Sequence, residues 1–380
     1  MSIDNPLPIL NVTQPTLPPL DEFIVQLRDI WDRKWLTNNG PYHQQFESAL
    51  AQYLGVKHVS LFCNGMIALQ VGLQALEVTG EVITTPFSFP ATTHAIHWNH
   101  CTPVFCDIEP ETCNLDPACI EALITSRTTC ILPVHVYGNP CNVDDIMKIS
   151  EKHGCKVFFD AAHAFGVRMN GESLLKSGHL SMLSFHATKV FNTIEGGALI
   201  TNDSKLKERI DFLKNFGFSD ETTVIEPGTN GKMNEIQAAY GLLQLKYIDS
   251  AIAERRAVAG WYRRSLAGIP GIRFFEDTPG VTQNYSYFPI FIDEHQYGMT
   301  RDDLYWRLKE QRINGRRYFY PLISSFPMYT GLPSASSVNL PEANIMAERV
   351  LCLPIHTGLR AEDLSRVVQV VLAHKEDRLV

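Results

Sequence analysis

Ser184-Phe185-His186-Ala187-Thr188-Lys189 places a lysine a few residues after a run of strand-forming side chains. Glu195-Gly196-Gly197 follows it, and Asp160-Ala161-Ala162-His163 lies upstream, directly after another apolar run. Short apolar runs bounded by small and polar residues are typical of buried strands. The lysine, the aspartate and the glycine pair are therefore expected at the ends of strands.

Working outward from this stretch, residues 58 to 250 alternate short β-branched or aromatic runs with helical stretches. This rhythm predicts an α/β fold, with a mostly parallel central sheet covered by helices on both faces. A helical pattern over residues 233–266 is expected to lead into a smaller domain, which begins a second rhythm with a strand at 287–292. We expect a large domain over residues 1–250 and a small C-terminal domain over residues 251–380. The strands predicted for the large domain are 59–62, 82–84, 104–106, 130–133, 157–159, 182–185 and 198–200.

Composition favours small-molecule chemistry. The chain has 380 residues, 45% of them hydrophobic and 19% charged, and can bury a sizeable core. Its formal net charge is −8 and no basic run offsets it, which argues against a nucleic-acid or membrane partner. No apolar stretch is long enough to cross a bilayer, and residues 1–8 lack a signal pattern, so a cytoplasmic protein is expected. The nine cysteines include no Cys-x-x-Cys pair and are expected to be buried thiols, with no metal site.

Three candidate groups follow predicted strands and could touch one ligand, because reactive groups collect at the carboxyl ends of parallel strands. These groups are Cys63-Asn64-Gly65, Asp160 and His186. At residues 64–68 a strand leads into a helical run, so free backbone N–H groups could face a phosphate, with Ser184 adding a hydroxyl. A glycine between strand and helix is more often simple turn punctuation.

Asp160 and Lys189 suggest pyridoxal phosphate as the cofactor. A carboxylate at Asp160 could pair with a protonated pyridine nitrogen, although an aspartate there could equally be a helix N-cap. Lys189, desolvated by Phe185 and Phe191, could offer a free amine for a Schiff base. Most lysines are solvated surface charges, so this hypothesis depends on the surrounding residues.

Aromatic and histidine side chains complete the candidate site. Phe87 and Phe89 are candidates to stack on a planar ring, and each could instead belong to the core. His163 could reach the ring hydroxyl or act as a structural donor.

Together these residues resemble the DegT/DnrJ/EryC1/StrS family of sugar aminotransferases, which have the fold type I architecture of aspartate aminotransferase. The resemblance covers nearly the whole chain. The matching motifs are Thr37 to Pro41 with Phe46-Glu47, Asn64-Gly65, Phe89 with Ala91-Thr92, Pro133-Val134-His135 with Tyr137-Gly138, Asp160 to His163, Ser184 to Lys189, Glu195-Gly196-Gly197, and Gly228 to Asn234.

The resemblance implies a role for each cofactor residue and a homodimer with shared active sites. Lys189 is expected to form the Schiff base and to be the catalytic residue. The other cofactor contacts that it implies are Asp160 at the pyridine nitrogen, His163 at the phenolic oxygen, Phe89 on the ring, Gly65, Met66 and Ser184 at the phosphate, and Asn230 reaching the same phosphate from the partner subunit.

Two positions depart from the family pattern. The family usually has threonine or serine where Met66 stands, and commonly arginine where Lys232 stands. Met66 can therefore offer only its backbone N–H to a phosphate, and the resemblance does not assign its side chain.

Within the family, residues 35–41, 190–193 and 316–321 are most similar to members that move an amino group from L-glutamate to C-4 of dTDP-4-keto-6-deoxy-D-glucose, for lipopolysaccharide O-antigen. Arg316, Arg317 and Tyr320 are candidates to grip the nucleotide pyrophosphate, with a solvated basic turn as the alternative. Asn39 is also predicted to contact substrate. The spacing does not reveal which sugar carbon reacts.

Other functions keep the same cofactor residues. A C-3 ketosugar aminotransferase, a GDP-sugar 4-aminotransferase and a non-catalytic regulator that binds pyridoxal phosphate all remain open. A sugar dehydratase of this fold would lack the lysine, so Lys189 argues against it.

Overall fold

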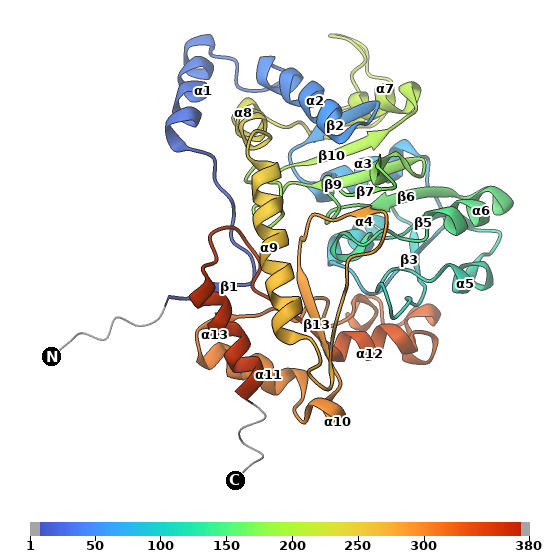
Figure 1. The fold of residues 1–380 in the computed structure, drawn as a ribbon. Coiled ribbons are helices and arrows are strands. Elements are labelled where there is room, and N and C mark those ends of the chain that lie inside the picture. Colours follow the sequence, from blue (N-terminus) through green and yellow to red (C-terminus); the bar gives the residue numbers. More distant parts are fainter. Residues whose placement is uncertain (1–7, 374–380) are drawn as a thin grey trace.

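A seven-stranded sheet organises the larger part of the molecule in the computed structural model, which describes residues 8–373 (Figure 1). β10 is antiparallel to both of its neighbours, and the other four pairings are parallel. The predicted α/β class and the seven predicted strands are therefore confirmed. In spatial order the strands are β2 (His58–Phe62), β10 (Gly197–Thr201), β9 (Leu180–Ser184), β6 (Lys156–Asp160), β5 (Thr128–Leu132), β3 (Glu81–Thr84) and β4 (Thr102–Phe105).

Helices cover both faces of this sheet because successive side chains of a strand point to opposite faces. In β6, Val157 and Phe159 belong to one core cluster, and Phe158 belongs to the other. The first cluster takes residues of α2 (Pro41–Leu54), α6 (Val143–His153) and α8 (Glu235–Gln244). The second takes residues of α3 (Gly65–Ala75), α4 (Pro90–Trp98) and α7 (Ser204–Leu213).

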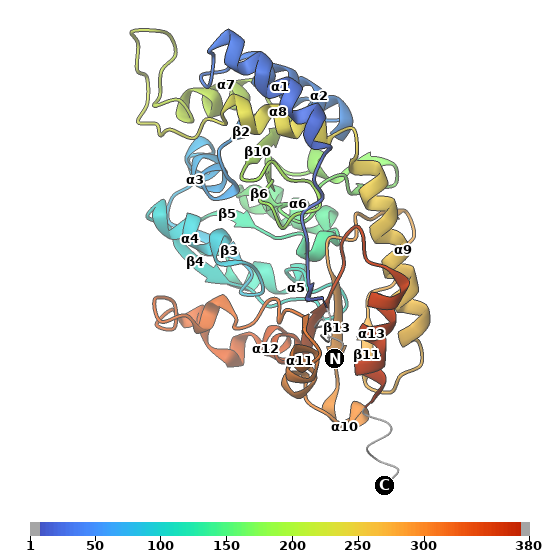
Figure 2. The ribbon, with the colours of Figure 1, turned by 90° about the vertical axis from the view of Figure 1, so that its left-hand side faces the viewer.

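A separate core lies in the C-terminal part, around an antiparallel sheet of three strands (Figure 2). The first described strand joins this core, because Leu10 of β1 (Leu10–Asn11) pairs with Ile313 of β14 (Ile313–Asn314) and packs in it. The domain boundary near residue 250 stays a prediction. The core is built from β11 (Ile272–Phe274), β13 (Phe288–Ile292), β15 (Val350–Leu353), α9 (Ile248–Leu266), α11 (Arg301–Glu310) and α13 (Ala361–Leu372).

The predicted connector over residues 233–266 is two helices and not one. α8 ends at Gln244 and α9 begins at Ile248. α8 packs against α2 and α1 (Leu20–Arg33), whereas α9 runs down to the C-terminal core (Figure 1). At the break, Tyr247 and Lys246 both bond to Glu22 of α1. An amphipathic pattern can continue through such a break, because each half still buries an apolar face.

The remaining elements connect these layers. Residues 1–7, which include most of the segment predicted to lack a signal pattern, lie outside the described residues. The short elements are β7 (Arg168–Met169), β8 (Glu172–Ser173), β12 (Val281–Thr282), α5 (Pro117–Ile120), α10 (Glu294–Tyr297) and α12 (Pro341–Arg349), with six 3₁₀ turns at 121–123, 136–138, 174–176, 323–325, 333–335 and 337–339.

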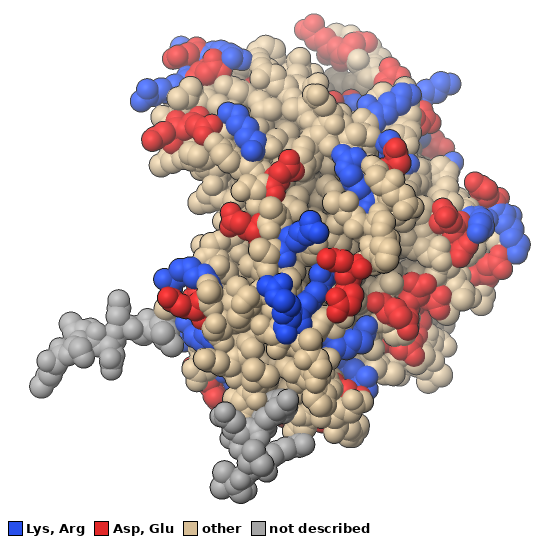
Figure 3. Space-filling view, viewed as in Figure 1, with Lys and Arg blue, Asp and Glu red and all other residues tan. Residues whose placement is uncertain are grey.

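Lysine and arginine are interspersed with aspartate and glutamate on the face drawn in Figure 3. None of the helices in the described part combines enough length with enough apolar character to cross a bilayer. The nine cysteines are all free. Residues 8–373 contain no group of three or more histidine, cysteine, aspartate or glutamate side chains arranged to hold a metal ion.

α3 lies so close to the sheet that one of its positions has no room for a side chain. A Cβ at Gly72 would lie 2.6 Å from the Phe158 ring and 2.9 Å from Leu180. By contrast, a Cβ at Gly260 of α9 would meet only the far end of Arg264, at 3.4 Å. We expect Gly72→Ala to lower the free energy of unfolding by about 1–3 kcal/mol, because the packed core must shift. Gly260→Ala should raise it by ~0.5–1 kcal/mol through helix propensity.

Denaturant unfolding of both variants beside the wild type measures these changes. A Gly72→Ala protein that is as stable as the Gly260→Ala protein would show that α3 does not press on the sheet as described.

Candidate active site

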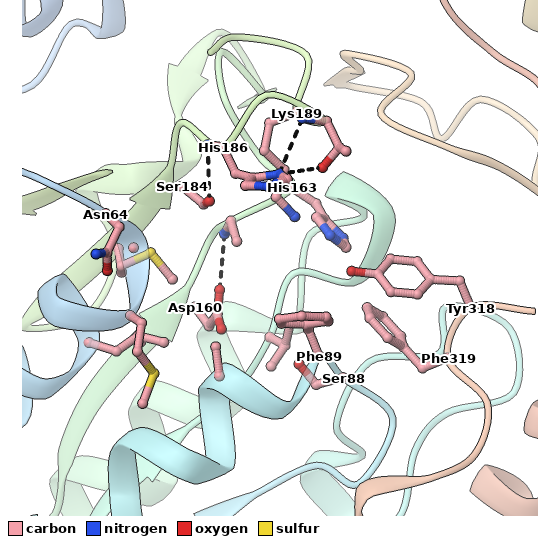
Figure 4. Close-up of a pocket in the computed structure, with 18 of the residues that line it drawn as sticks. Asn64, Ser88, Phe89, Asp160, His163, Ser184, His186, Lys189, Tyr318 and Phe319 are labelled. Atoms are coloured by element: carbon pink, nitrogen blue, oxygen red, sulfur yellow. Dashed lines mark hydrogen bonds between the residues drawn. The ribbon is translucent and has the colours of Figure 1, made fainter. Parts of the chain in front are cut away.

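A cavity of about 460 Å³ opens where β2, β6 and β9 end (Figure 4). Asn64 follows β2, Asp160 ends β6 and His186 follows β9, and the structure brings all three to this cavity. Cys63, named with them from the sequence, is not among its lining residues. The lining residues are Asn64, Gly65, Met66, Ile67, Leu69, Ser88, Phe89, Ala91, Val134, Asp160, Ala162, His163, Met182, Ser184, His186, Thr188, Lys189, Glu195, Arg316, Tyr318 and Phe319.

Lys189 reaches this cavity from the loop between β9 and β10. Its side chain is partly exposed along the cavity, but its amine is enclosed by protein. Burial lowers the pKa of Lys189 to about 8, against the attraction of Asp160, and the positive charge of Arg316 lowers it further. About a tenth of the amine is therefore unprotonated at pH 7, and this is the form that attacks a carbonyl carbon.

Asp160 is buried at the floor of the cavity, with 4% of its surface exposed. One carboxylate oxygen accepts from the Thr92 hydroxyl at 2.8 Å, and the other accepts from the backbone N–H of Ala162 at 3.0 Å. Burial raises the pKa of this carboxyl, while the bonds from Ala162 and Thr92 and the charge of Lys189 lower it. The bond from Ala162 closes a turn, but no helix begins within residues 161–167, so the helix N-cap alternative for Asp160 is wrong.

The His163 ring lies nearly parallel to the neighbouring rings of Tyr137 and Phe319, with centroid distances of 6.4 and 5.8 Å and interplanar angles of 8° and 2°. Burial among them drives the pKa of His163 well below its ordinary value, so the ring is neutral. Its Nδ1 accepts from the backbone N–H of Tyr137 at 3.2 Å, which leaves the proton on Nε2. The histidine can therefore donate one hydrogen bond to a ligand.

The start of α3 forms one corner of the cavity, where backbone N–H groups have no partner within the helix. The Asn64 side chain caps the helix by accepting from Ile67 at 2.9 Å, so the N–H groups of Gly65 and Met66 precede the capped position. A Cβ at Gly197 would lie 2.8 Å from the Gly65 nitrogen, and one at Gly65 would lie 3.4 Å from the Ser184 hydroxyl. Only glycines allow strand β10, the helix start and this hydroxyl to come so close.

The two phenylalanines proposed for stacking lie in different surroundings. Phe89 is the N-cap residue of α4, is 48% exposed and lines the cavity (Figure 4). Phe87 is fully buried in a core cluster and makes edge contacts with Tyr137 and Phe319. Phe89 is therefore the one of the two that can touch a ligand.

Of the three residues predicted to grip the pyrophosphate, one lines the cavity and two lie outside it. Arg316 lines the cavity. Arg317 and Tyr320 do not line it, and Arg317 instead bonds to Asp302 at 3.1 Å and lies over the Tyr320 ring. The structure does not test their proposed contact with a pyrophosphate, which stays a prediction.

Asn39 and Asn230 lie away from this cavity. Asn39 lines a second, polar cavity of about 410 Å³, together with Lys214 and Lys232. Asn230 is exposed, in the segment that pairs with Asn215. Their predicted roles depend on a second subunit or on substrate and stay predictions.

Sequence reasoning assigned no role to Thr92, Thr188 and Glu195, and it named His186 only as a group that could touch the ligand. Thr92 was noticed as part of a motif, but nothing in the sequence links it to Asp160, 68 residues away. His186 lies 3.6 Å from Glu195 at the rim, and its other nitrogen bonds to the Thr188 hydroxyl at 2.8 Å. His186, Thr188 and Glu195 all lie between Ser184 and Gly196 in the sequence, and this proximity to Lys189 indicated that they belong to the site.

Comparison with known proteins agrees with this geometry. Residues 20–372 match the sequence model of the DegT/DnrJ/EryC1/StrS aminotransferase family. The chain is 52% identical over 366 residues to dTDP-4-amino-4,6-dideoxy-D-glucose transaminase of Escherichia coli, covering 95% of this chain and 97% of that protein. It is 49% identical over 360 residues to the transaminase of the same name from Shigella dysenteriae, with 95% and 97% covered. A crystal structure of DesI in the presence of its TDP-sugar product superposes with a TM-score of 0.93 at 37% identity, covering 98% of this chain and 94% of that one. The chain belongs to the DegT/DnrJ/EryC1/StrS aminotransferase family.

Proposed function

We propose that this protein transfers the amino group of L-glutamate to C-4 of dTDP-4-keto-6-deoxy-D-glucose, using pyridoxal phosphate. The products are 2-oxoglutarate and dTDP-4-amino-4,6-dideoxy-D-glucose, a building block for surface polysaccharide. The observation that carries this proposal is the enclosed amine of Lys189, which shares one cavity with the buried carboxylate of Asp160. High identity to two transaminases named for this product supports the choice of sugar.

The residues of the cavity fit pyridoxal phosphate. Lys189 offers an amine to its aldehyde, Asp160 a carboxylate to its pyridine nitrogen, and Phe89 an exposed ring face to its plane. The N–H groups of Gly65 and Met66 and the Ser184 hydroxyl suit its phosphate, because a helix N-terminus favours an anion. When bound, the cofactor supplies an electron sink for the bonds at the substrate carbon that carries nitrogen.

The protein's own groups bind and move protons around that carbon. In each half of the reaction, Nζ of Lys189, with its pKa near 8, would accept a proton from one reacting carbon and return it to another. Asp160 presents its carboxyl group at the floor of the cavity, held in place by the hydrogen bond from Thr92. Nε2 of neutral His163 can donate to an oxygen acceptor, and this histidine is buried beside the rings of Tyr137 and Phe319.

Attachment of pyridoxal phosphate to the apoprotein should depend on pH through Lys189. Only the unprotonated amine reacts, so the attachment rate should rise about tenfold per pH unit below pH 8 and level off above it. Stopped-flow absorbance between pH 6 and pH 10 measures this rate. A rate that still rises above pH 10 would mean that the amine is an ordinary solvated lysine.

Two variants identify the reacting amine in the same experiment. Lys189→Ala should attach no cofactor, and borohydride should trap none on the protein. Lys246→Ala, which removes an exposed lysine paired with Glu22, should behave as the wild type. Trapping on Lys189→Ala would assign the linkage to another lysine.

We propose further that the active form is a homodimer in which Asn230 of one subunit contacts the cofactor phosphate in the other. Asn230 is exposed and does not line its own subunit's cavity, which supports a contact across subunits. Several exposed apolar side chains near the N-terminus, including those of Leu20, Val25 and Trp31, are suited to burial against a second copy.

Mixed dimers should reveal the shared site. When a Lys189→Ala subunit pairs with an Asn230→Ala subunit, one of the two sites has both residues intact if Asn230 acts across the interface. We therefore expect purified, differently tagged heterodimers to regain transfer activity that both parent homodimers lack. Heterodimers no more active than their parents would place Asn230 in its own subunit's site or outside both.

The sugar is tested by single-turnover assays with glutamate as donor. The holoenzyme should convert dTDP-4-keto-6-deoxy-D-glucose, and should convert its 3-keto isomer and the GDP counterpart much more slowly. Mass spectrometry of the products measures the transfer. Conversion of only the 3-keto sugar or only the GDP sugar would replace the proposed substrate, and conversion of none would indicate a non-catalytic role.

A further inference from the structure

Arg316 is held in a fixed position in the cavity wall. Its backbone pairs with that of Cys352 through two hydrogen bonds of 3.1 and 2.8 Å, which tie it to the edge of β15. Its guanidinium lies over the Tyr318 ring, 4.3 Å from the ring centroid. A guanidinium stacked on an aromatic face keeps its N–H groups free, because they point outward in the plane of the guanidinium. They can bind a ligand that lies in that plane.

No acidic side chain within residues 8–373 forms a salt bridge with Arg316. The neighbouring Arg317 is paired with Asp302, and Arg301 is paired with the same aspartate. Arg316 is also the one arginine among the residues that line the cavity. A guanidinium that lines a cavity and has no carboxylate partner favours an anionic ligand that can accept from both arms of the fork.

We infer that Arg316 binds the α-carboxylate of the amino-acid donor; this inference rests on the proposed function. In glutamate the amine and the α-carboxylate are attached to the same carbon. The amine must reach the position where the Lys189 amine acts, so a group that binds the α-carboxylate must lie beside Lys189. Arg316 meets this condition, since both residues line the same cavity.

The electrostatics of the site agree with this placement. The charge of Arg316 acts on Lys189 and on His163, lowering the pKa of each. An incoming carboxylate would offset this charge at the moment when the donor's amine arrives.

A nucleotide pyrophosphate fits this position less well. The keto carbon of the proposed sugar lies across the ring from the carbon that carries the pyrophosphate. When the keto carbon is beside Lys189, the whole sugar ring separates Lys189 from the phosphates. The geometry therefore assigns Arg316 to the donor and leaves the pyrophosphate to groups further out.

Four substrates separate the possible roles of Arg316 in the holoenzyme. Half-reactions are measured with glutamate, with 4-aminobutyrate, which is glutamate without the α-carboxylate, and with the ketosugar on the aminated enzyme. Alanine, which has the α-carboxylate and lacks the γ-carboxylate, completes the set. For Arg316→Ala we expect the efficiency with glutamate to fall roughly 10- to 150-fold, as for a lost charge-assisted bond. The efficiency with alanine should fall by a similar factor, while the efficiencies with 4-aminobutyrate and with the ketosugar should change less than about threefold.

Each other pattern overturns the inference. An equal loss with glutamate and 4-aminobutyrate would place Arg316 at the γ-carboxylate. A loss of efficiency confined to the ketosugar would place Arg316 at the nucleotide. An equal loss of efficiency with every substrate would make Arg316 a structural residue. Arg316→Lys, which keeps the charge but not the fork, should recover part of the glutamate efficiency, and Arg264→Ala, an exposed arginine of α9, serves as the control.

A binding measurement gives the same answer without turnover. Calorimetry of the holoenzyme with glutarate, which has both carboxylates and no amine, should show weaker binding to Arg316→Ala than to the wild type. Binding of dTDP should be unchanged. Weaker dTDP binding with unchanged glutarate binding would contradict the inference. If the wild type binds glutarate but transfers nitrogen to no sugar, the proposed function fails while the role of Arg316 in binding stands.

Discussion

The amine of Lys189 and the carboxylate of Asp160 occupy one enclosed space, and the rest of the site is arranged around this pair. Burial alone would neutralise both groups, since it lowers the pKa of the lysine and raises that of the aspartate. Their mutual attraction opposes this effect in each case. The balance leaves a reactive amine beside a polar floor, as a site for carbonyl chemistry requires.

Close packing of α3 against the sheet fixes one side of this space. Gly72 lets the helix rest on Phe158, and Gly197 lets strand β10 approach the first residues of the helix. The N–H groups at the helix start are thereby held next to the Ser184 hydroxyl, where an anion can bind all of them. Backbone groups position this corner, so the absence of a hydroxyl at Met66 leaves its N–H available.

The opposite wall belongs to the C-terminal part of the chain. Tyr318 and Phe319 pack with Tyr137 and His163 in an aromatic cluster that links the two cores. Arg316, from the same segment, contributes a guanidinium to the cavity that has Asp160 at its floor. The site therefore exists only when both cores are folded and packed together, although each core has its own sheet.

The sequence by itself determined the layers and the reactive pair. Apolar runs such as 157–159 and 198–200 predicted strands, because burial on both faces leaves few polar positions. A residue that ends such a run must lie where the strand ends.

Tertiary structure decided the rest. Phe87 and Phe89 are two residues apart, yet one is core and the other lines the cavity. Arg316 and Arg317 are adjacent, yet one faces Lys189's cavity and the other Asp302. Thr92 reaches Asp160 across 68 residues, and the helix predicted over 233–266 breaks where Glu22 binds it. Local pattern shows which residues are apolar or charged, but the neighbours that each side chain meets depend on how distant segments pack.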